Sequence, residues 1–128
     1  MNIEQKTKEV IINAIENRAL KVGAKKSEIA ITLYVESENK VGVVFLRNGQ
    51  AEIKSSINSI LGSYSLMPTV SSTVNNKIYN ALKGFSEKLQ ASILTLNARL
   101  FIIEDELIAN LYMNGELTKK ILIEDILN

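Results

Sequence analysis

The sequence predicts an α+β fold in which two tandem α-β-β-β units form a two-layer sandwich, with an antiparallel sheet of about six strands and two helices on one face. Three observations lead to this prediction. Apolar residues recur at helical spacing twice along the chain, each time ahead of three runs that alternate like strands. An Asn-Gly pair stands at the same place in both halves. The two halves also align along their length.

The first half begins with an apolar stripe at helical spacing over residues 3–22. Gly23 follows directly, and glycine favours the left-handed conformation in which many helices end. Three runs with period-two alternation and many β-branched side chains come next, which is typical of strands. Asn48-Gly49 predicts a tight hairpin between the last two, because both central residues of such a turn need a positive φ. We expect these strands over residues 29–35, 41–47 and 51–57.

The second half repeats this order. Residues from Val74 to Leu89 carry a helical stripe, and residues 71–73 offer side chains that can cap its start. Asn114-Gly115 predicts another tight hairpin. We expect strands over residues 95–103, 107–113 and 117–123. Residues 121–127 are also compatible with a helical turn.

The aligned halves indicate an internal duplication. Leu33 falls on Leu100, and Ile57 falls on Ile123. The alternative is two unrelated units that share a bias toward Ile, Asn and Lys. Under the first interpretation the chain is a single domain with unit one at about 1–61, a connecting loop at about 62–70 and unit two at about 71–128.

Composition excludes several chemistries. The chain has no Cys and no His, which removes disulfides, thiolate ligands and imidazole bases. The formal net charge is +1, so neither a nucleic acid nor a membrane is expected as a partner. No signal peptide or long apolar run is visible, which predicts a cytoplasmic protein. The abundance of Ile, Asn and Lys favours a bacterial or phage origin.

Strand alternation predicts which side chains face the helices. The inward sets are Ile31, Leu33, Val35, Val41, Val43, Phe45, Ile53 and Ile57 in unit one, and Ala98, Leu100, Ile102, Leu107, Ala109, Leu111, Ile121 and Ile123 in unit two. The opposite face then carries an unusual number of large apolar groups for a sheet face in contact with water. We therefore expect an interface at Tyr34, Val44, Leu46, Phe101, Ile103, Ile108, Tyr112 and Leu122. The alternative is that residues 64–70 or the C-terminal residues fold over this face.

These features favour a non-enzymatic binding or assembly protein that forms a homo-oligomer, most simply a dimer, through its apolar sheet face. The alternative function is a small-molecule-binding protein that holds an anionic ligand, such as a nucleotide or an organic acid, at an oligomer seam. An Arg guanidinium with amide and hydroxyl neighbours suits such a ligand. The candidate ligand residues are Thr95, Asn97, Arg99, Asn110, Tyr112 and Tyr34. We expect no cofactor, metal ion or catalytic residue, although a hydrolase that uses carboxylates alone is a third reading.

Overall fold

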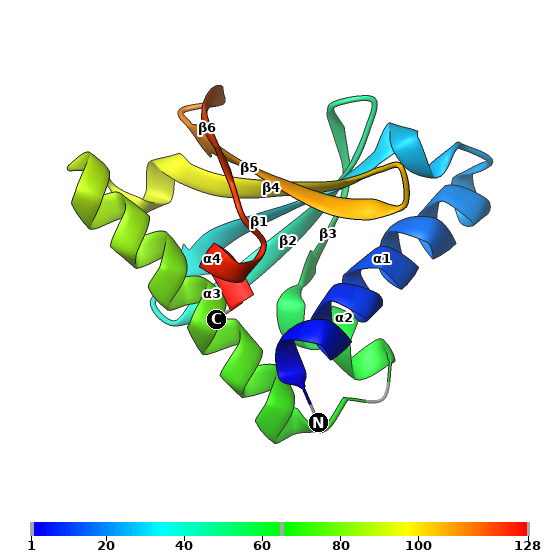
Figure 1. Ribbon diagram of the computed structural model, residues 1–128, viewed down its shortest axis with the longest axis horizontal. Helices are drawn as coiled ribbons and strands as arrows, with labels where there is room; N and C mark the ends of the chain where they lie inside the picture. Colours follow the sequence, from blue (N-terminus) through cyan, green and yellow to red (C-terminus); the bar gives the residue numbers. More distant parts are fainter. Residues whose placement is uncertain (1, 65, 128) are drawn as a thin grey trace.

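Two long helices and six strands form the frame of the molecule (Figure 1). The computed structural model describes residues 2–64 and 66–127. The first half contains α1 (Ile3–Val22), the 3-10 turn η1 (Lys26–Glu28), β1 (Ile29–Ser37), β2 (Lys40–Arg47), β3 (Gln50–Ser56) and α2 (Ile57–Ser63). The second half contains α3 (Pro68–Leu89), η2 (Ile93–Thr95), β4 (Leu96–Ile103), β5 (Glu106–Met113), β6 (Glu116–Ile121) and α4 (Glu124–Leu127).

The strands form one antiparallel sheet in the order β3-β2-β1-β4-β5-β6. The α+β class and the six-stranded antiparallel sheet are thus confirmed. The two halves meet at the centre, where β1 pairs with β4 and Thr32 lies directly opposite Arg99. The two edges are formed by β3 and β6.

Local chemistry explains where the long helices begin and end. The Asn2 side chain accepts a hydrogen bond from the backbone of Gln5 at the start of α1, and Gly23 closes this helix at a φ of 69°. The start of α3 differs from the expectation. This helix begins at Pro68, ahead of the predicted cap at residues 71–73, because proline fits the first helical position, where no amide hydrogen is needed.

The Asn-Gly pairs form the tips of both hairpins. Asn48 and Gly49 have φ values of 51° and 82°, and Asn114 and Gly115 have values of 53° and 80°. Both central residues of each turn are therefore left-handed, as a tight two-residue hairpin requires.

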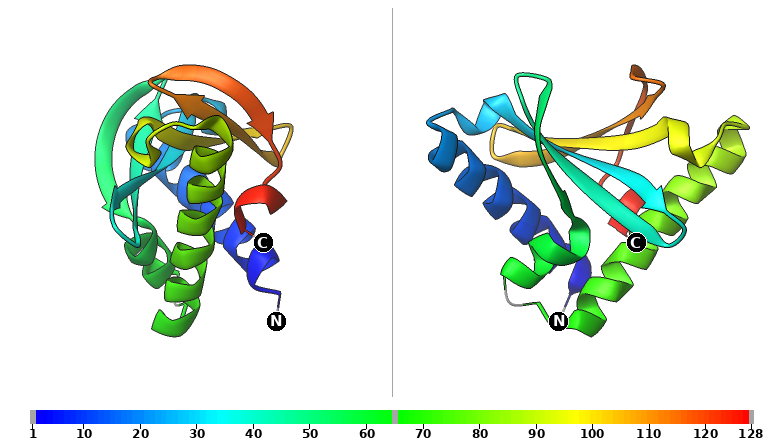
Figure 2. Two further views of the ribbon diagram at one scale, coloured as in Figure 1. Left: turned by 90° about the vertical axis from the view of Figure 1, so that its left-hand side faces the viewer. Right: turned by 180° about the vertical axis from the view of Figure 1, so that it is seen from behind.

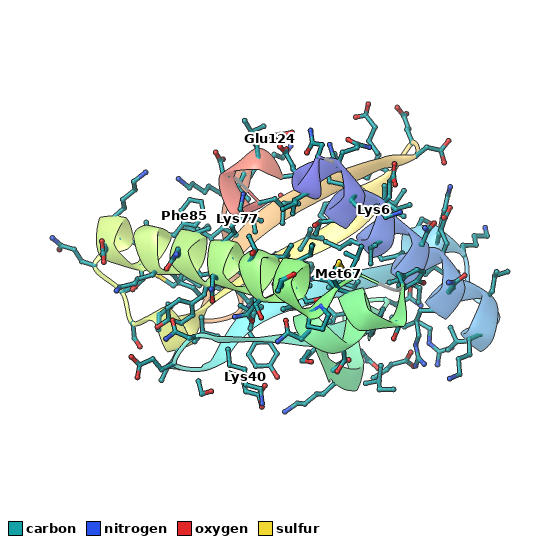
Figure 3. The ribbon with its side chains drawn as sticks, turned by 90° about the horizontal axis from the view of Figure 1, so that it is seen from below. Lys6, Lys40, Met67, Lys77, Phe85 and Glu124 are labelled. Atoms are coloured by element: carbon teal, nitrogen blue, oxygen red, sulfur yellow. The ribbon has the colours of Figure 1, made fainter. Side chains whose placement is uncertain are left out.

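Both long helices lie on one side of the sheet, where most of the predicted inward side chains are buried (Figures 1 and 2). Figure 3, which looks at this side, shows α1, α3 and α4 in front of the strands, with Phe85 on α3. Two of the predicted inward side chains face the helices but are less covered than the rest. Phe45 is only half-buried, and Ile53 is 45% exposed. Ile53 lies on the edge strand β3, next to a register shift in the β2–β3 ladder, so no helix covers it fully.

The element ends also differ from the expectation. Ile57 does not end a strand but starts the short helix α2, because Ser56 caps it by accepting a hydrogen bond from the backbone of Ser59. The last strand ends at Ile121, and α4 follows as a single helical turn. The buried side chains of Ile126 and Leu127 hold this turn in the core. The expected loop at 62–70 is also shorter, because α2 extends to Ser63 and α3 begins at Pro68.

An exposed ion pair links the two halves. Lys26 of η1 contacts Asp105 in the β4–β5 turn and lies 3.6 Å from Glu16 of α1. The hydrogen bond from Lys26 lowers the pKa of Asp105 below its ordinary value of 3.8, and the same bond raises the pKa of Lys26 above 10.5. A carboxyl group with a lowered folded-state pKa stabilises the fold above its unfolded pKa, and this contribution is lost as the pH falls through the folded value.

We expect Asp105→Asn to cause a small loss of unfolding free energy at pH 7 and a smaller loss at about pH 2, because the contribution of the carboxylate is lost as the pH falls through its lowered folded-state pKa. Asparagine tolerates the positive φ of 66° at this position, so the backbone is preserved. Urea unfolding at both pH values measures the difference. A loss of the same size in acid would show that Asp105 acts through something other than its charge.

Candidate ligand site on the outer sheet face

The outer face is the side of the sheet turned away from α1 and α3. Figures 1 and 2 show that the tips of the β2–β3 and β5–β6 hairpins project away from the helices on this side. The segments expected as possible covers do not lie over it. Tyr64, Leu66 and Val70 pack against the core between sheet and helices, and so do the buried residues of α4. The outer face is therefore free of chain segments among residues 2–64 and 66–127.

Arg99 lies at the centre of this face, on β4. Its guanidinium carbon is 4.2 Å from the centre of the Tyr112 ring, and Nη1 donates a long hydrogen bond of 3.4 Å to the Tyr112 hydroxyl. Within the described residues, Arg99 has no acidic group at ion-pair distance. A half-buried cation with an aromatic ring as its main contact is poorly compensated, because burial removes water without supplying a counter-charge. Arg99 is thus a candidate contact for an anionic group.

Buried polar atoms without a partner surround Arg99. Its own Nε is buried and has no hydrogen-bond partner among the described residues. The same holds for the hydroxyl oxygen of Thr32 and the amide oxygens of Asn97 and Asn110. Thr32 and Asn110 lie directly opposite Arg99 in the neighbouring strands. A buried polar atom that lacks a partner costs about 1–3 kcal/mol, so these four atoms are energetically unfavourable in the chain by itself.

The structure brings together five of the six predicted ligand residues. Asn97 pairs with Tyr34 of β1 and with Tyr112 of β5, and Arg99 pairs with Asn110. Thr95 is separate. It belongs to η2 rather than to the strand, and its hydroxyl group donates to the backbone carbonyl of Ser92 within that turn.

A hollow of about 250 Å³ opens beside Arg99. Phe101, Asn110 and Tyr112 line it, together with the Asn48-Gly49 turn. Glu28 stands in the same lining, but its carboxylate accepts hydrogen bonds from the Lys25 backbone and the Asn48 side chain. These bonds lower the pKa of Glu28 below its ordinary value of 4.5. The carboxylate is therefore already engaged, whereas Arg99 has no acidic partner among the described residues.

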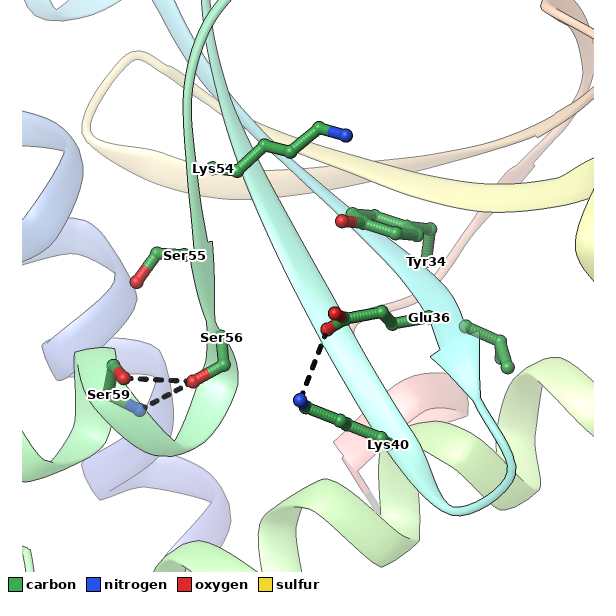
Figure 4. A pocket seen from close by; sticks show the side chains of 8 residues that line it. Tyr34, Glu36, Lys40, Lys54, Ser55, Ser56 and Ser59 are labelled. Carbon is green, nitrogen blue, oxygen red and sulfur yellow. Dashed lines mark hydrogen bonds and ion pairs between the residues drawn. The ribbon is translucent and has the colours of Figure 1, made fainter.

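A second and larger hollow of about 590 Å³ lies toward β3 (Figure 4). Lys54 and Tyr34 line it together with three serines. A β-carbon added at Gly42 would stand 2.5 Å from the Tyr34 ring, so the ring lies directly on this glycine. The remaining charges of this hollow form a pair, with Lys40 Nζ 3.8 Å from Glu36.

The serines of this hollow have structural partners. The Ser56 hydroxyl donates to the Ser59 hydroxyl at 2.9 Å and accepts from the Ser59 backbone at 3.1 Å, as the dashed lines in Figure 4 show. These bonds cap α2. The hydrogen-bond partners that the structure gives for the Ser56 and Ser59 hydroxyls are both serine groups of this cap, so these two hydroxyls have a structural role.

The residues predicted to form an interface differ in burial. Five are half-buried, and these are Tyr34, Val44, Phe101, Ile108 and Tyr112. Leu46 is buried within the chain itself, while Ile103 and Leu122 are exposed. Leu122 lies outside β6, so it is not a sheet-face residue. The apolar side chains of the outer face therefore shield one another to a considerable extent.

Comparison with known proteins gives no relative, because no family model, curated protein or solved structure matches the chain. Within the described residues, no helix combines the length and the apolar character needed to cross a membrane. The same residues contain no group of three or more acidic side chains placed to hold a metal ion. Functional inference therefore rests on the outer face itself.

Proposed function

We propose that this chain is a non-enzymatic binding protein that holds an anionic ligand on its outer sheet face, with Arg99 as the main anchor. The observation that carries this proposal is the uncompensated Arg99 guanidinium, whose buried Nε has no partner within the described residues. An Arg fork pairs with a phosphate or carboxylate through charge-assisted hydrogen bonds. Thr32 can donate to the same ligand, and the amides of Asn97 and Asn110 can orient it.

Thermal melts with added anions test this proposal. We expect inorganic phosphate, a nucleoside monophosphate or citrate to raise the melting temperature, because a ligand that binds only the folded state stabilises it. Arg99→Gln removes the charge and should abolish the rise. Arg47→Gln is the matched control, since Arg47 is paired with Glu52 at 2.7 Å and should leave the rise intact. A rise that survives Arg99→Gln, or no rise with any of these anions, would contradict the proposal.

A second candidate is the homo-oligomer predicted from the sequence. It is favoured by two large apolar side chains at the ends of the outer face, Ile103 and Leu117, which are 52% and 55% exposed. A contact centred on the outer face would bring the Arg99 groups of two copies together, which opposes association unless an anion lies between them. A light-scattering mass that stays monomeric over a wide concentration range would remove this candidate.

We also propose that the chain is a single cytoplasmic domain built as a two-layer sandwich from two duplicated units. The sequence alignment that places Leu33 on Leu100 also places Thr32 on Arg99, and these two residues are direct partners at the centre of the sheet. The order of elements is the same in residues 3–63 and 68–127. A duplication in which each unit contributes three strands to one continuous sheet accounts for both facts.

A further inference from the structure

Strand pairing creates a basic row that is not visible in the linear sequence. The ladders place Lys54 opposite Val44, Val44 opposite Thr32, and Thr32 opposite Arg99. On the other side, Arg99 is opposite Asn110, and Asn110 is opposite Lys120. One line across all six strands of the outer face therefore reads Lys54, Val44, Thr32, Arg99, Asn110 and Lys120. We call this line the basic row.

The three cations of the basic row lack counter-charges. Neither Lys54 nor Lys120 forms an ion pair within the described part of the chain, and the same is true of Arg99. The two lysines stand on the edge strands, and their side chains are exposed. The row contains no acidic residue, so its charge is available to an anionic partner.

Aromatic rings flank the basic row on both sides. Tyr34 follows Thr32 by two residues on β1, and Phe101 follows Arg99 by two residues on the antiparallel strand β4. The two rings therefore lie on opposite sides of the row. Tyr34 lines the larger hollow and Phe101 lines the smaller one. Because the Tyr34 ring rests on Gly42, a flat group can approach it from the solvent side.

The length of the basic row distinguishes a mononucleotide from a longer anionic chain as its ligand. Five gaps between neighbouring strands, at about 4.8 Å each, give the row a length of about 24 Å. A mononucleotide cannot reach from Lys54 to Lys120 over this distance, whereas a chain of several nucleotides can. An acidic peptide would match the charges but would supply no regular series of rings for Tyr34 and Phe101. Regularly spaced phosphates with flat bases fit both features.

We propose that the outer face binds a single-stranded nucleic acid that runs across the strands, with phosphates at Lys54, Arg99 and Lys120 and bases stacked on Tyr34 and Phe101. This inference rests on the proposed anion site at Arg99 and names its ligand class. Nucleic acid is not expected from the net charge of +1, because the three cations lie far apart in the sequence. The cross-strand register is what assembles them into one surface.

Fluorescence anisotropy with labelled 12-nucleotide oligothymidylate and oligouridylate tests the proposal. With three phosphate contacts, we expect a slope of about −2 for log affinity against log salt, or about a 20-fold loss between 50 and 200 mM salt. Lys54→Gln and Lys120→Gln should each weaken binding and reduce the steepness of the slope by about 0.7. Tyr34→Leu should weaken binding about fivefold or more without a change in slope.

Lys83→Gln is the matched control, because Lys83 is exposed on α3, on the opposite side of the sheet. It should leave affinity and salt slope unchanged. The proposal is overturned if neither oligonucleotide binds at 50 mM salt, or if Lys83→Gln weakens binding as much as Lys54→Gln does. Equal competition by polyglutamate would also overturn it, because it would show that charge alone is recognised.

Failure of this inference can be told apart from failure of the anion site. If phosphate and a nucleoside monophosphate raise the melting temperature through Arg99, but oligonucleotides bind no more tightly than the monophosphate, the strand proposal is wrong and the anion site stands. The other outcome is that Arg99→Gln changes neither the melting temperature with anions nor the oligonucleotide affinity, while Lys54→Gln and Lys120→Gln lower that affinity. In that case both proposals are wrong, because both require Arg99 to contact the anion.

Discussion

Leu100→Ala is expected to lower the free energy of unfolding by about 2–5 kcal/mol, the range typical of a buried leucine truncated to alanine. Leu100 is 0% exposed and lies on β4 at the centre of the sheet. Its partners are Ile31 on one side and Ala109 on the other. Strands pair on both sides of it and helices cover its face, so the surroundings cannot easily collapse into the cavity.

Urea unfolding followed by circular dichroism measures this loss, and Leu20→Ala is the matched control. The same atoms are removed there, but Leu20 is 81% exposed on α1, so a change within about 0.5 kcal/mol is expected. Similar losses for the two variants would contradict the placement of the core between the sheet and the helices.

Asn75→Ala is expected to destabilise the fold by about 1–3 kcal/mol, because it leaves a buried backbone group without a hydrogen bond. Asn75 lies on α3 and is only 6% exposed. Its side-chain oxygen accepts from the buried backbone of Val41 at 2.9 Å, and its nitrogen donates to the carbonyl of Asn39 at 2.8 Å. This one side chain therefore joins α3 to the start of β2.

Asn80→Ala serves as the control for Asn75→Ala, since Asn80 is exposed on the same helix. Replacing it should change the free energy of unfolding by less than about 0.5 kcal/mol. Thermal or urea unfolding of the two variants, together with hydrogen exchange at the Val41 amide, measures the contribution of Asn75. A Val41 amide that stays protected in Asn75→Ala would mean that the bond is unimportant.

Local signals were sufficient to predict most elements. Gly23 predicted the end of α1, and Asn48-Gly49 and Asn114-Gly115 predicted both hairpins, because these features depend on backbone preferences of one or two residues. Alternation placed Leu33 and Leu100 in the core, where both are fully buried. The short helix α2 was missed and α4 was left open between a strand and a helical turn, because both depend on contacts of Ile60 and Leu127 with a core assembled from distant segments.

The candidate site was predictable only in part. Alternation put Asn97, Arg99 and Tyr112 on one face, since residues two apart on a strand share a side. It did not reveal that Asn75 is a buried link, because a polar residue on an amphipathic helix normally faces water. It also did not single out Lys54 or Lys120, since lysines on edge strands are common and usually serve only to keep the edge soluble.

The sequence alone determined the type and order of the two long helices and the six strands, because turn chemistry, alternation and helical spacing act over a few residues. Only the tertiary structure decided that β1 pairs with β4, since this contact joins segments about half the chain apart. That pairing sets Thr32 against Arg99 and aligns Lys54 with Lys120 across the sheet. The register of a sheet is a long-range property, and here it determines which charges meet on one surface.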